Sequence, residues 1–388
     1  MKVQAVSNDV KATYGEQQSE MERYLVEGEK RALALGNRGP IRYNKNGSLH
    51  EDILESYWET GFYVFTDVLD KKELLDIEKD VNDFLECVPI SEESMLDQNG
   101  NRAITSGLKA RNLFWATPLS DPFGGTDIAG GRHPAKMFEP TPTENAPEKD
   151  IYLILGSLQF SEACLRVYGH PDLLRVAEAI NGKDFTPFNE ALFIKRPGIG
   201  ASVAWHQDGL THWDSPRWDY GTHGFNFMAQ VYGSTAANGL WVVPGTHKLG
   251  KLDIKKLVSE AGTDRLPEAV PMLCAPGDVG ITNRQALHGS FANVSENTRL
   301  TVNFGFHRRE SVLGVTAGGV HNARATYDEK RIKERSRLIP YAIDARRQKY
   351  PNESSYIYAP LADEEDKYRW NAQAKVNIRD YNLQDLSI

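Results

Sequence analysis

Apolar residues recur at helical spacing in three stretches of the first half of the chain. These stretches cover residues 50–60, 70–88 and 170–182, and each predicts a helix with one buried face. A glycine stands at the end of the first and of the third, as expected of the residue that best tolerates the left-handed backbone at a helix C-terminus. Between the first two, "FYVFTDV" (62–68) predicts a short buried strand.

From residue 185 onward the pattern changes to short β-branched and aromatic runs separated by Gly, Pro and Asn. The runs are "FTPFNEALFIKRP", "GFNFMAQVYG", "GLWVVPG", "GDVGITN" and "RLTVNFGFH". Strands at this spacing predict an antiparallel sandwich or barrel. Lys195 and Arg196 end the first of these strands and are expected at a solvated strand end, with contact to an anion as the alternative. After residue 310 the chain becomes helical with alternating charges, so Arg346 and Arg347 are expected on a solvated helix face.

These patterns divide the chain into a polar arm, one folded domain and a helical extension. The arm is expected to be loose, with a helical piece around residues 20–34. The segment 97–150 is rich in Gly, Pro, Asp and Asn and is too long for a plain connection. It therefore predicts a lid or binding loop, with a disordered insertion as the alternative. The expected boundaries are 1–45 for the arm, 46–310 for the main folded domain with its barrel at about 185–308, and 311–388 for an extension packed on the same domain.

Composition and charge narrow the class of protein. The chain has 388 residues, of which 40% are hydrophobic and 25% charged, as is ordinary for a globular protein with a large core. The formal net charge of −8 argues against nucleic acid or an anionic membrane as the main partner. No apolar run reaches the length of a membrane span. Three widely separated cysteines favour a reducing cytoplasm and exclude a thiolate zinc site.

The candidate chemistry lies in His-x-Asp pairs, of which the chain has four. They are His50-Asp52, His170-Asp172, His206-Asp208 and His212-Asp214. The first two open predicted helices, where an aspartate is explained by its interaction with free backbone N–H groups. The third ends an extended segment, so its two side chains share one face and aim at one point. The fourth lies in the Trp- and Pro-rich loop that follows and is not expected to bind a metal.

A third ligand and an anion receptor are expected further along the chain. His288 follows a strand and a short turn in "APGDVGITNRQALHGS" (275–290), and Arg299 opens the next strand. By the period of two, Arg299 and Thr301 share a face. They present a guanidinium fork and a hydroxyl, which suit a carboxylate in a partly desolvated pocket.

The set His206, Asp208 and His288 matches the donors of a facial triad on Fe(II), which leaves three adjacent positions open. A 2-oxo acid fills two of these by chelation while its far carboxylate reaches Arg299, and dioxygen takes the third. Two alternatives stay open. A Zn- or Mn-dependent hydrolase or isomerase would use the same triad but leaves Arg299 without a function. A catalytically silent, metabolite-binding barrel does not explain why every ligand is present.

With these motifs in place, the sequence resembles the phytanoyl-CoA dioxygenase family of Fe(II)- and 2-oxoglutarate-dependent oxygenases. The motifs that carry the resemblance are Trp205-His206-Gln207-Asp208, "NGLWVVPGTHK" (238–248), "APGDVGITNRQALHGS" and Arg299, over a region from about Leu54 to Phe306. The resemblance implies a mainly β fold with flanking helices, namely a double-stranded β-helix of the cupin-like jelly-roll type.

The resemblance also implies the roles of the site residues. It implies Fe(II) bound by His206, Asp208 and His288, with 2-oxoglutarate held by Arg299 and Thr301. It implies that O₂ and 2-oxoglutarate are consumed, that succinate and CO₂ are formed, and that a C–H bond of a small molecule is oxidised, most readily by hydroxylation. Halogenases of this superfamily replace the carboxylate ligand by a small residue, so Asp208 argues against that activity. The oligomeric state is not indicated.

Residues around the metal pair are candidates for substrate contact. Trp205 stands beside a ligand, although packing is the favoured alternative. His212, Trp213 and His223 follow the pair directly and are candidates for the mouth of the barrel, with chance polar loop residues as the alternative. Asn189 faces into the barrel or caps its strand.

Overall fold

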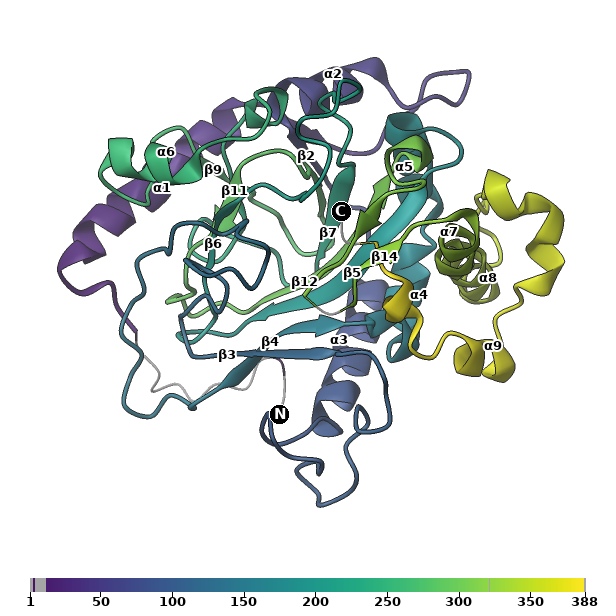
Figure 1. Cartoon of the computed structure of the whole chain (residues 1–388), viewed down its shortest axis with the longest axis horizontal. Helices are drawn as coiled ribbons and strands as arrows, with labels where there is room; N and C mark the ends of the chain where they lie inside the picture. The colour runs from purple at the N-terminus through teal and green to yellow at the C-terminus, as the bar shows by residue number, and fades with distance from the viewer. Residues whose placement is uncertain (1–2, 4–11, 321, 387–388) are drawn as a thin grey trace.

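The computed structural model describes residues 3, 12–320 and 322–386, and two β-sheets enclose its centre (Figure 1). The large sheet has the order β1 (Arg38–Gly39), β2 (Phe62–Phe65), β10 (Val279–Asn283), β7 (Phe225–Gln230), β12 (Arg299–His307), β5 (Thr186–Lys195), β4 (Asp150–Leu155) and β3 (Leu113–Ala116). The small sheet has the order β6 (Val203–His206), β11 (His288–Ser290), β8 (Trp241–Val242) and β9 (Val270–Pro271). A separate hairpin consists of β13 (Thr316–Ala317) and β14 (Ala325–Thr326).

The chain passes back and forth between the two sheets from β5 to β12. Strands β5, β7, β10 and β12 lie in the large sheet, whereas β6, β8, β9 and β11 lie in the small one. Neighbouring strands in this set pair antiparallel. These eight strands therefore wind into a double-stranded β-helix over residues 186–307, which confirms the predicted jelly-roll fold with flanking helices.

Helices cover the outer surfaces of the barrel. The α-helices of the described residues are α1 (Gln18–Ala34), α2 (Glu51–Thr60), α3 (Lys71–Glu86), α4 (Glu162–Tyr168), α5 (Pro171–Asn181), α6 (Ile254–Ala261), α7 (Glu329–Ser336), α8 (Leu338–Lys349) and α9 (Ala372–Asn377). Short 3₁₀ turns are η1 (Gly15–Gln17), η2 (Ser157–Gln159), η3 (Thr246–Lys248), η4 (Arg309–Ser311), η5 (Ala359–Lys367) and η6 (Tyr381–Gln384). None of the described helices combines the length and the apolar composition that a bilayer crossing requires.

The three helices predicted from apolar spacing are present as α2, α3 and α5, and their ends follow known capping chemistry. Gly61 ends α2 in the left-handed region, with φ +84°. Asp70 and Glu73 form a reciprocal capping box at the start of α3. The His170 imidazole accepts a hydrogen bond from the Asp172 N–H at the start of α5.

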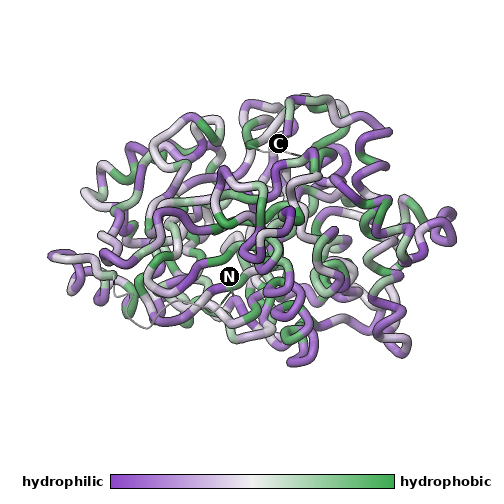
Figure 2. Tube along the Cα trace, turned by 90° about the horizontal axis from the view of Figure 1, so that it is seen from below, coloured by the Kyte–Doolittle hydropathy of each residue, from purple (hydrophilic) through white to green (hydrophobic). Residues whose placement is uncertain are grey.

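The main apolar core lies between the large sheet and the helices on its outer face. It includes Ile77 of α3, Leu173 of α5, Ile194 of β5, Phe304 of β12 and Ile339 of α8, all almost fully buried. Figure 1 shows α4, α5, α7 and α8 on this side of the sheet. The hydrophobic segments gather in the interior, whereas hydrophilic segments dominate the outer loops and helices (Figure 2). The helical layer thus leaves the inner face of the sheet free to line the barrel.

Three basic residues expected in solvent are buried instead, so those predictions are wrong. Lys195 and Arg196 are 3% and 1% exposed, and Arg196 pairs with Asp150 of β4 at 2.5 Å. Arg346 is 4% exposed and pairs with Glu73 of α3 at 2.7 Å. Their partners come from distant parts of the chain, which local charge patterning does not reveal. Burial of a cation is tolerated because these partners satisfy it.

The N-terminal arm is not loose over its described part, because α1 packs on the outer face of the small sheet. Met21 and Tyr24 are buried there, and the Tyr24 ring stacks on Trp241 with centroids 4.6 Å apart. The helical piece expected at 20–34 is confirmed. Residues 1–2 and 4–11 of the predicted arm lie outside the described residues, and the division of the chain at residues 45 and 310 stays a prediction.

Gly28 of α1 permits this close docking, and its substitution provides a test. A Cβ at this position would lie 2.3 Å from Cη2 of Trp241, whose ring is completely buried. Gly→Ala within a helix normally stabilises by about 1 kcal/mol, but overpacking a core costs about 1–3 kcal/mol. We expect Gly28→Ala to lower the free energy of unfolding by about 1–2 kcal/mol. Urea denaturation of this variant beside Glu27→Ala, an exposed position of the same helix, measures the effect; equal or higher stability for Gly28→Ala would contradict the packing.

Candidate metal centre and its cavity

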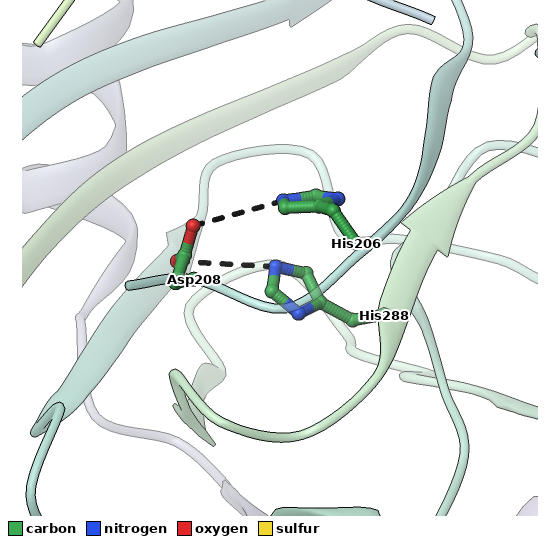
Figure 3. Close-up of side chains that lie close together, drawn as sticks. All are labelled: His206, Asp208 and His288. Carbon is green, nitrogen blue, oxygen red and sulfur yellow. Dashed lines mark ion pairs between the residues drawn. The ribbon is translucent and has the colours of Figure 1, made fainter. Parts of the chain in front are cut away.

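The pairing of β6 with β11 brings the predicted metal ligands together. His206 ends β6 and His288 begins β11, and the two are direct partners in the antiparallel register. Asp208 follows β6 by two residues and closes the group (Figure 3). Its Oδ1 lies 3.8 Å from Nε2 of His206, and its Oδ2 lies 4.0 Å from Nε2 of His288. In the described part of the chain, these three form the one cluster of His, Cys, Asp or Glu with ligand atoms within 4.8 Å of one another.

Backbone hydrogen bonds fix the orientation of both imidazoles. Nδ1 of His206 is 2.8 Å from the carbonyl oxygen of Ala204, and Nδ1 of His288 is 2.8 Å from that of Ala286. A carbonyl only accepts, so Nδ1 carries the proton and the Nε2 lone pair points toward Asp208. Burial lowers the pKa of both rings, which favours the neutral form that a metal needs. The donor set of two neutral imidazoles and one carboxylate fits Fe(II), with open positions left over.

Asp208 is held as a carboxylate by two arginines and an amide. Arg132 Nη1 donates to Oδ1 at 2.8 Å, Asn226 Nδ2 donates to Oδ2 at 3.2 Å, and Arg284 Nε approaches Oδ2 at 3.4 Å. Burial opposes ionisation of this carboxyl, but Arg284 and the other nearby positive groups hold its pKa well below its usual range. Asp208 is therefore an anion ready to bind a cation.

Part of the 97–150 segment covers the triad. The His133 ring stacks on that of His206, with centroids 4.1 Å apart and planes 16° apart. Its Nδ1 lies 3.6 Å from Oδ2 of Asp121, which in turn accepts a hydrogen bond from the Ala204 N–H of β6 at 2.6 Å. Residues of this segment also line the cavity beside the triad. The segment thus forms one wall of the site, as a lid or binding loop does, and it is not a disordered insertion.

Arg299 lines the cavity, and the buried Lys195 shares a hydrogen-bond partner with it. Arg299 of β12 donates from Nη1 to the carbonyl oxygen of Asn238 at 2.8 Å and to Oγ of Ser290 at 3.3 Å, while its Nε has no hydrogen-bond partner among the described residues. Lys195 Nζ donates to the same Ser290 Oγ at 2.5 Å. Burial lowers the pKa of Arg299 to about 10. Thr301 lines the cavity beside Arg299, as the period of two predicts. A guanidinium group and a hydroxyl side by side suit the binding of a carboxylate.

Of the five residues predicted to contact substrate, the structure places one at the cavity. Asn189 of β5 lines it. Trp205 faces the opposite side of the small sheet, because neighbours on a strand alternate, and its Nε1 donates to the Asp264 carbonyl at 2.6 Å. His212 and Trp213 lie on the outer loop after Asp208, and the buried His223 is held by the Thr211 carbonyl at 2.6 Å. These four do not line the cavity.

The other His-x-Asp pairs lie where the sequence placed them. His50 and Asp52 contact each other at the exposed start of α2, and His170 caps α5. His212 has φ +71° in the loop after β6, and its Nδ1 lies 2.7 Å from Oγ1 of Thr211. None of the three recruits a third metal-ligating side chain from the described residues.

Several residues of the site were not found from the sequence. Arg132 and His133 belong to a loop without periodicity, and Arg284 lies in the turn before His288. One signal was available for Ser290, because it follows His288 by two residues and so shares its face in β11. No local pattern marks Arg132, His133 or Arg284, since they reach the site through long-range folding.

We expect His206→Ala to abolish tight binding of a divalent metal, whereas His212→Ala retains it. Loss of a ligand removes more affinity than the roughly 10–100-fold that is lost with outer partners of a metal ligand. Calorimetric titration of the apoprotein with Mn(II), a stable analogue of Fe(II), measures both variants. Equal affinity in the two would exclude His206 as a ligand.

Comparison with known proteins agrees with the motifs. A curated relative, phytanoyl-CoA dioxygenase 1 of Oryza sativa subsp. japonica, is 32% identical over 114 residues, which cover 27% of this chain and 38% of that protein. The chain thus matches less than half the length of this relative. Among solved structures, EctD from S. alaskensis with 2-oxoglutarate and 5-hydroxyectoine has 17% identity and a TM-score of 0.49, over 72% of this chain and 83% of that one. The epimerase SnoN from nogalamycin biosynthesis has 14% identity and a TM-score of 0.43, over 66% and 82%.

The family itself is identified by a broader match. The model described as Phytanoyl-CoA dioxygenase (PhyH) matches residues 57–301. This region contains β2, the whole β-helix up to Thr301 of β12, all three residues of the candidate metal centre, and Arg299. The chain therefore belongs to the phytanoyl-CoA dioxygenase (PhyH) family.

Proposed function

We propose that this protein is a non-haem Fe(II)- and 2-oxoglutarate-dependent dioxygenase that hydroxylates a C–H bond of a small molecule. In the balanced reaction, one O₂ and one 2-oxoglutarate are consumed; one oxygen atom enters the substrate as a hydroxyl group and the other enters succinate, with release of CO₂. The observation that carries the proposal is a single cavity lined by His206, Asp208 and His288 together with Arg299 and Thr301. Membership of the PhyH family supports it.

The residues of the cavity divide into two functional groups. His206, Asp208 and His288 would hold the iron, which when bound supplies the chemistry that activates dioxygen. Arg299 and Thr301 would orient the far carboxylate of 2-oxoglutarate. The retained carboxylate of Asp208 favours hydroxylation over halogenation, because no ligand position is vacated for a halide.

Ser290 and Lys195 position the receptor for the cosubstrate. Ser290 Oγ accepts from both Lys195 and Arg299, and it donates to the carbonyl oxygen of Gly239 at 2.8 Å. Lys195 and Arg299 are also register partners in the pairing of β5 with β12. The sheet itself therefore holds the two side chains next to each other, and the permanently charged Arg299 is the group that attracts a carboxylate.

The walls between these groups favour the exclusion of water. Phe123, Tyr152, Leu153, Phe188 and Phe193 line the cavity with apolar and aromatic surface. Such a lining keeps bulk water from the reacting C–H bond and suits a small organic substrate.

The two alternative functions explain less of the site. A Zn- or Mn-dependent hydrolase or isomerase would use the triad but not the buried guanidinium of Arg299. A silent metabolite-binding barrel has no need of three intact ligands with both imidazoles fixed by backbone carbonyls.

Anaerobic titration of the apoprotein with Fe(II) and then 2-oxoglutarate tests the proposed function. Chelation by a 2-oxo acid gives Fe(II) a weak visible charge-transfer absorption, which we expect in the parent protein and not in His288→Ala. Absence of the band in the parent, combined with tight retention of Zn(II), would favour the hydrolase or isomerase.

Replacing Arg299 by Gln should raise the concentration of 2-oxoglutarate required for succinate release. A hydrogen bond between charged groups contributes about 1.5–3 kcal/mol, which corresponds to roughly a 10–100-fold higher requirement. The exposed Arg23→Gln on α1 is the control for a change of charge alone. Succinate formation as a function of 2-oxoglutarate concentration gives both values, and an unchanged requirement in Arg299→Gln would assign the anchor to another cation.

A further inference from the structure

The proposed function assigns no bound molecule to two of the arginines that line the cavity. The charged side chains that line the cavity, apart from histidines, are Arg132, Arg284 and Arg299 on the positive side and Asp208 on the negative side. Arg299 is assigned to 2-oxoglutarate, so Arg132 and Arg284 are in excess. Both lie next to the triad, where a substrate must approach.

The two arginines flank the same carboxylate from opposite sides. Arg132 Nη1 is bonded to Oδ1 of Asp208, and Arg284 Nε approaches Oδ2. The Nη2 group of each has no hydrogen-bond partner among the described residues. Neither group is among the buried polar atoms left without a partner, so both reach open space. Two donor groups without a partner among the described residues therefore belong to arginines that line the cavity.

Arg284 is fixed in position by an aromatic ring of the cavity wall and by two residues outside the cavity. Its guanidinium carbon lies 3.6 Å from the centroid of the Phe188 ring. Its Nη1 donates to the carbonyl oxygen of His223 at 3.1 Å and lies 2.9 Å from Nε2 of His307. The side chain is almost completely buried. Such preorganisation lowers the entropic cost of binding an anion.

The balance of charges in the cavity also indicates that an anion binds beside Arg132 and Arg284. With iron and 2-oxoglutarate bound, the three negative charges of Asp208 and the cosubstrate balance the three positive charges of Fe(II) and Arg299. The charges of Arg132 and Arg284 then have no counter-charge left in the cavity lining. Arg284 is almost completely buried, and a buried charge is costly unless it is paired. An anionic group on the substrate would pair it.

Resting on the proposed function, we propose that the substrate is an organic anion, a carboxylate or phosphate ester, whose acidic group binds the Nη2 groups of Arg132 and Arg284. Its apolar body lies against the aromatic wall formed by Phe123, Tyr152, Phe188 and Phe193. Arg132 comes from the 97–150 segment and Arg284 from the barrel, so a bound anion also joins that segment to the barrel. The alternative is that the two arginines only stabilise the Asp208 carboxylate and that the charge of the substrate does not affect its binding.

The test measures binding of matched acids and neutral analogues to the Fe(II)-loaded protein under anaerobic conditions. Saturating 2-oxoglutarate is present, so that Arg299 is occupied. The pairs are butanoate and butanamide, 3-phenylpropanoate and 3-phenylpropanamide, and phenyl phosphate and phenol, titrated by calorimetry. We expect at least one acid to bind roughly tenfold or more tightly than its neutral partner. If no acid binds more tightly than its neutral counterpart, the proposal is overturned.

Substitutions then test whether Arg132 causes the tighter binding of acids. Arg132→Gln should reduce the ratio between acid and neutral analogue to about threefold or less, and Arg132→Lys should retain part of it. Arg102→Gln, an exposed change in the same segment away from the cavity, should leave the ratio unchanged. A full preference in Arg132→Gln would overturn the assignment even if the buried Arg284 cannot be replaced without loss of folding.

The same samples separate this inference from the proposed function. If 2-oxoglutarate does not bind to the iron-loaded protein, the proposed function fails. If 2-oxoglutarate binds and no acid is preferred, the dioxygenase proposal stands and only the anionic substrate is rejected.

Discussion

The antiparallel pairing of β6 with β11 determines where the candidate metal ligands lie. It sets His206 directly opposite His288, and the chain that leaves β6 brings Asp208 back to both rings. From β11 the chain crosses to the large sheet, where β12 begins with Arg299. Because the two sheets enclose the cavity, the candidate metal ligands and the carboxylate receptor face one interior from different sheets. A slip of one residue between β6 and β11 would turn one histidine outward and dissolve the cluster.

The second constraint is the excess of positive charge in that interior. Arg284 and Arg299 are 1% and 5% exposed, and Asp208 is the one carboxylate among the described residues that line the cavity. Desolvation of cations opposes folding, so such an arrangement weakens the protein unless anions bind there. Stability and binding are thereby linked, since ligands that bind only the folded state stabilise it.

The sequence was sufficient for those parts of the fold and site that depend on short periods. The period of two placed His206 with Asp208 and Arg299 with Thr301, and apolar spacing with capping residues gave α2, α3 and α5. The same period applied to Trp205 gives its outward direction, yet its position beside a ligand suggested contact with substrate.

The predictions that failed concern residues whose contact partners lie far away in the chain. Lys195 resembles a residue at a solvated strand end. In the folded protein its Nζ donates a hydrogen bond to Ser290, which lies on a strand of the other sheet. Arg346 belongs to a charged helix, and its burial is explained only by Glu73. Arg132 and His133 lie in a glycine-rich loop whose path over the barrel no local pattern specifies. Single-sequence periodicity records which face of an element is apolar, but not which distant side chain meets it.

The contacts of Asp208 show how one carboxylate can serve both the metal and the wall of the cavity. An ionised carboxylate has about four acceptor sites, two on each oxygen. Asn226 and Arg284 occupy those of Oδ2, and Arg132 occupies one on Oδ1. One acceptor site is left, on Oδ1, the oxygen that lies 3.8 Å from Nε2 of His206. A metal that binds at this acceptor site would not break any of these hydrogen bonds. Arg132 and Arg284 would therefore keep their contacts with Asp208 while their Nη2 groups bind a further anion. The three donors that keep Asp208 ionised would thus leave it one acceptor site for a metal.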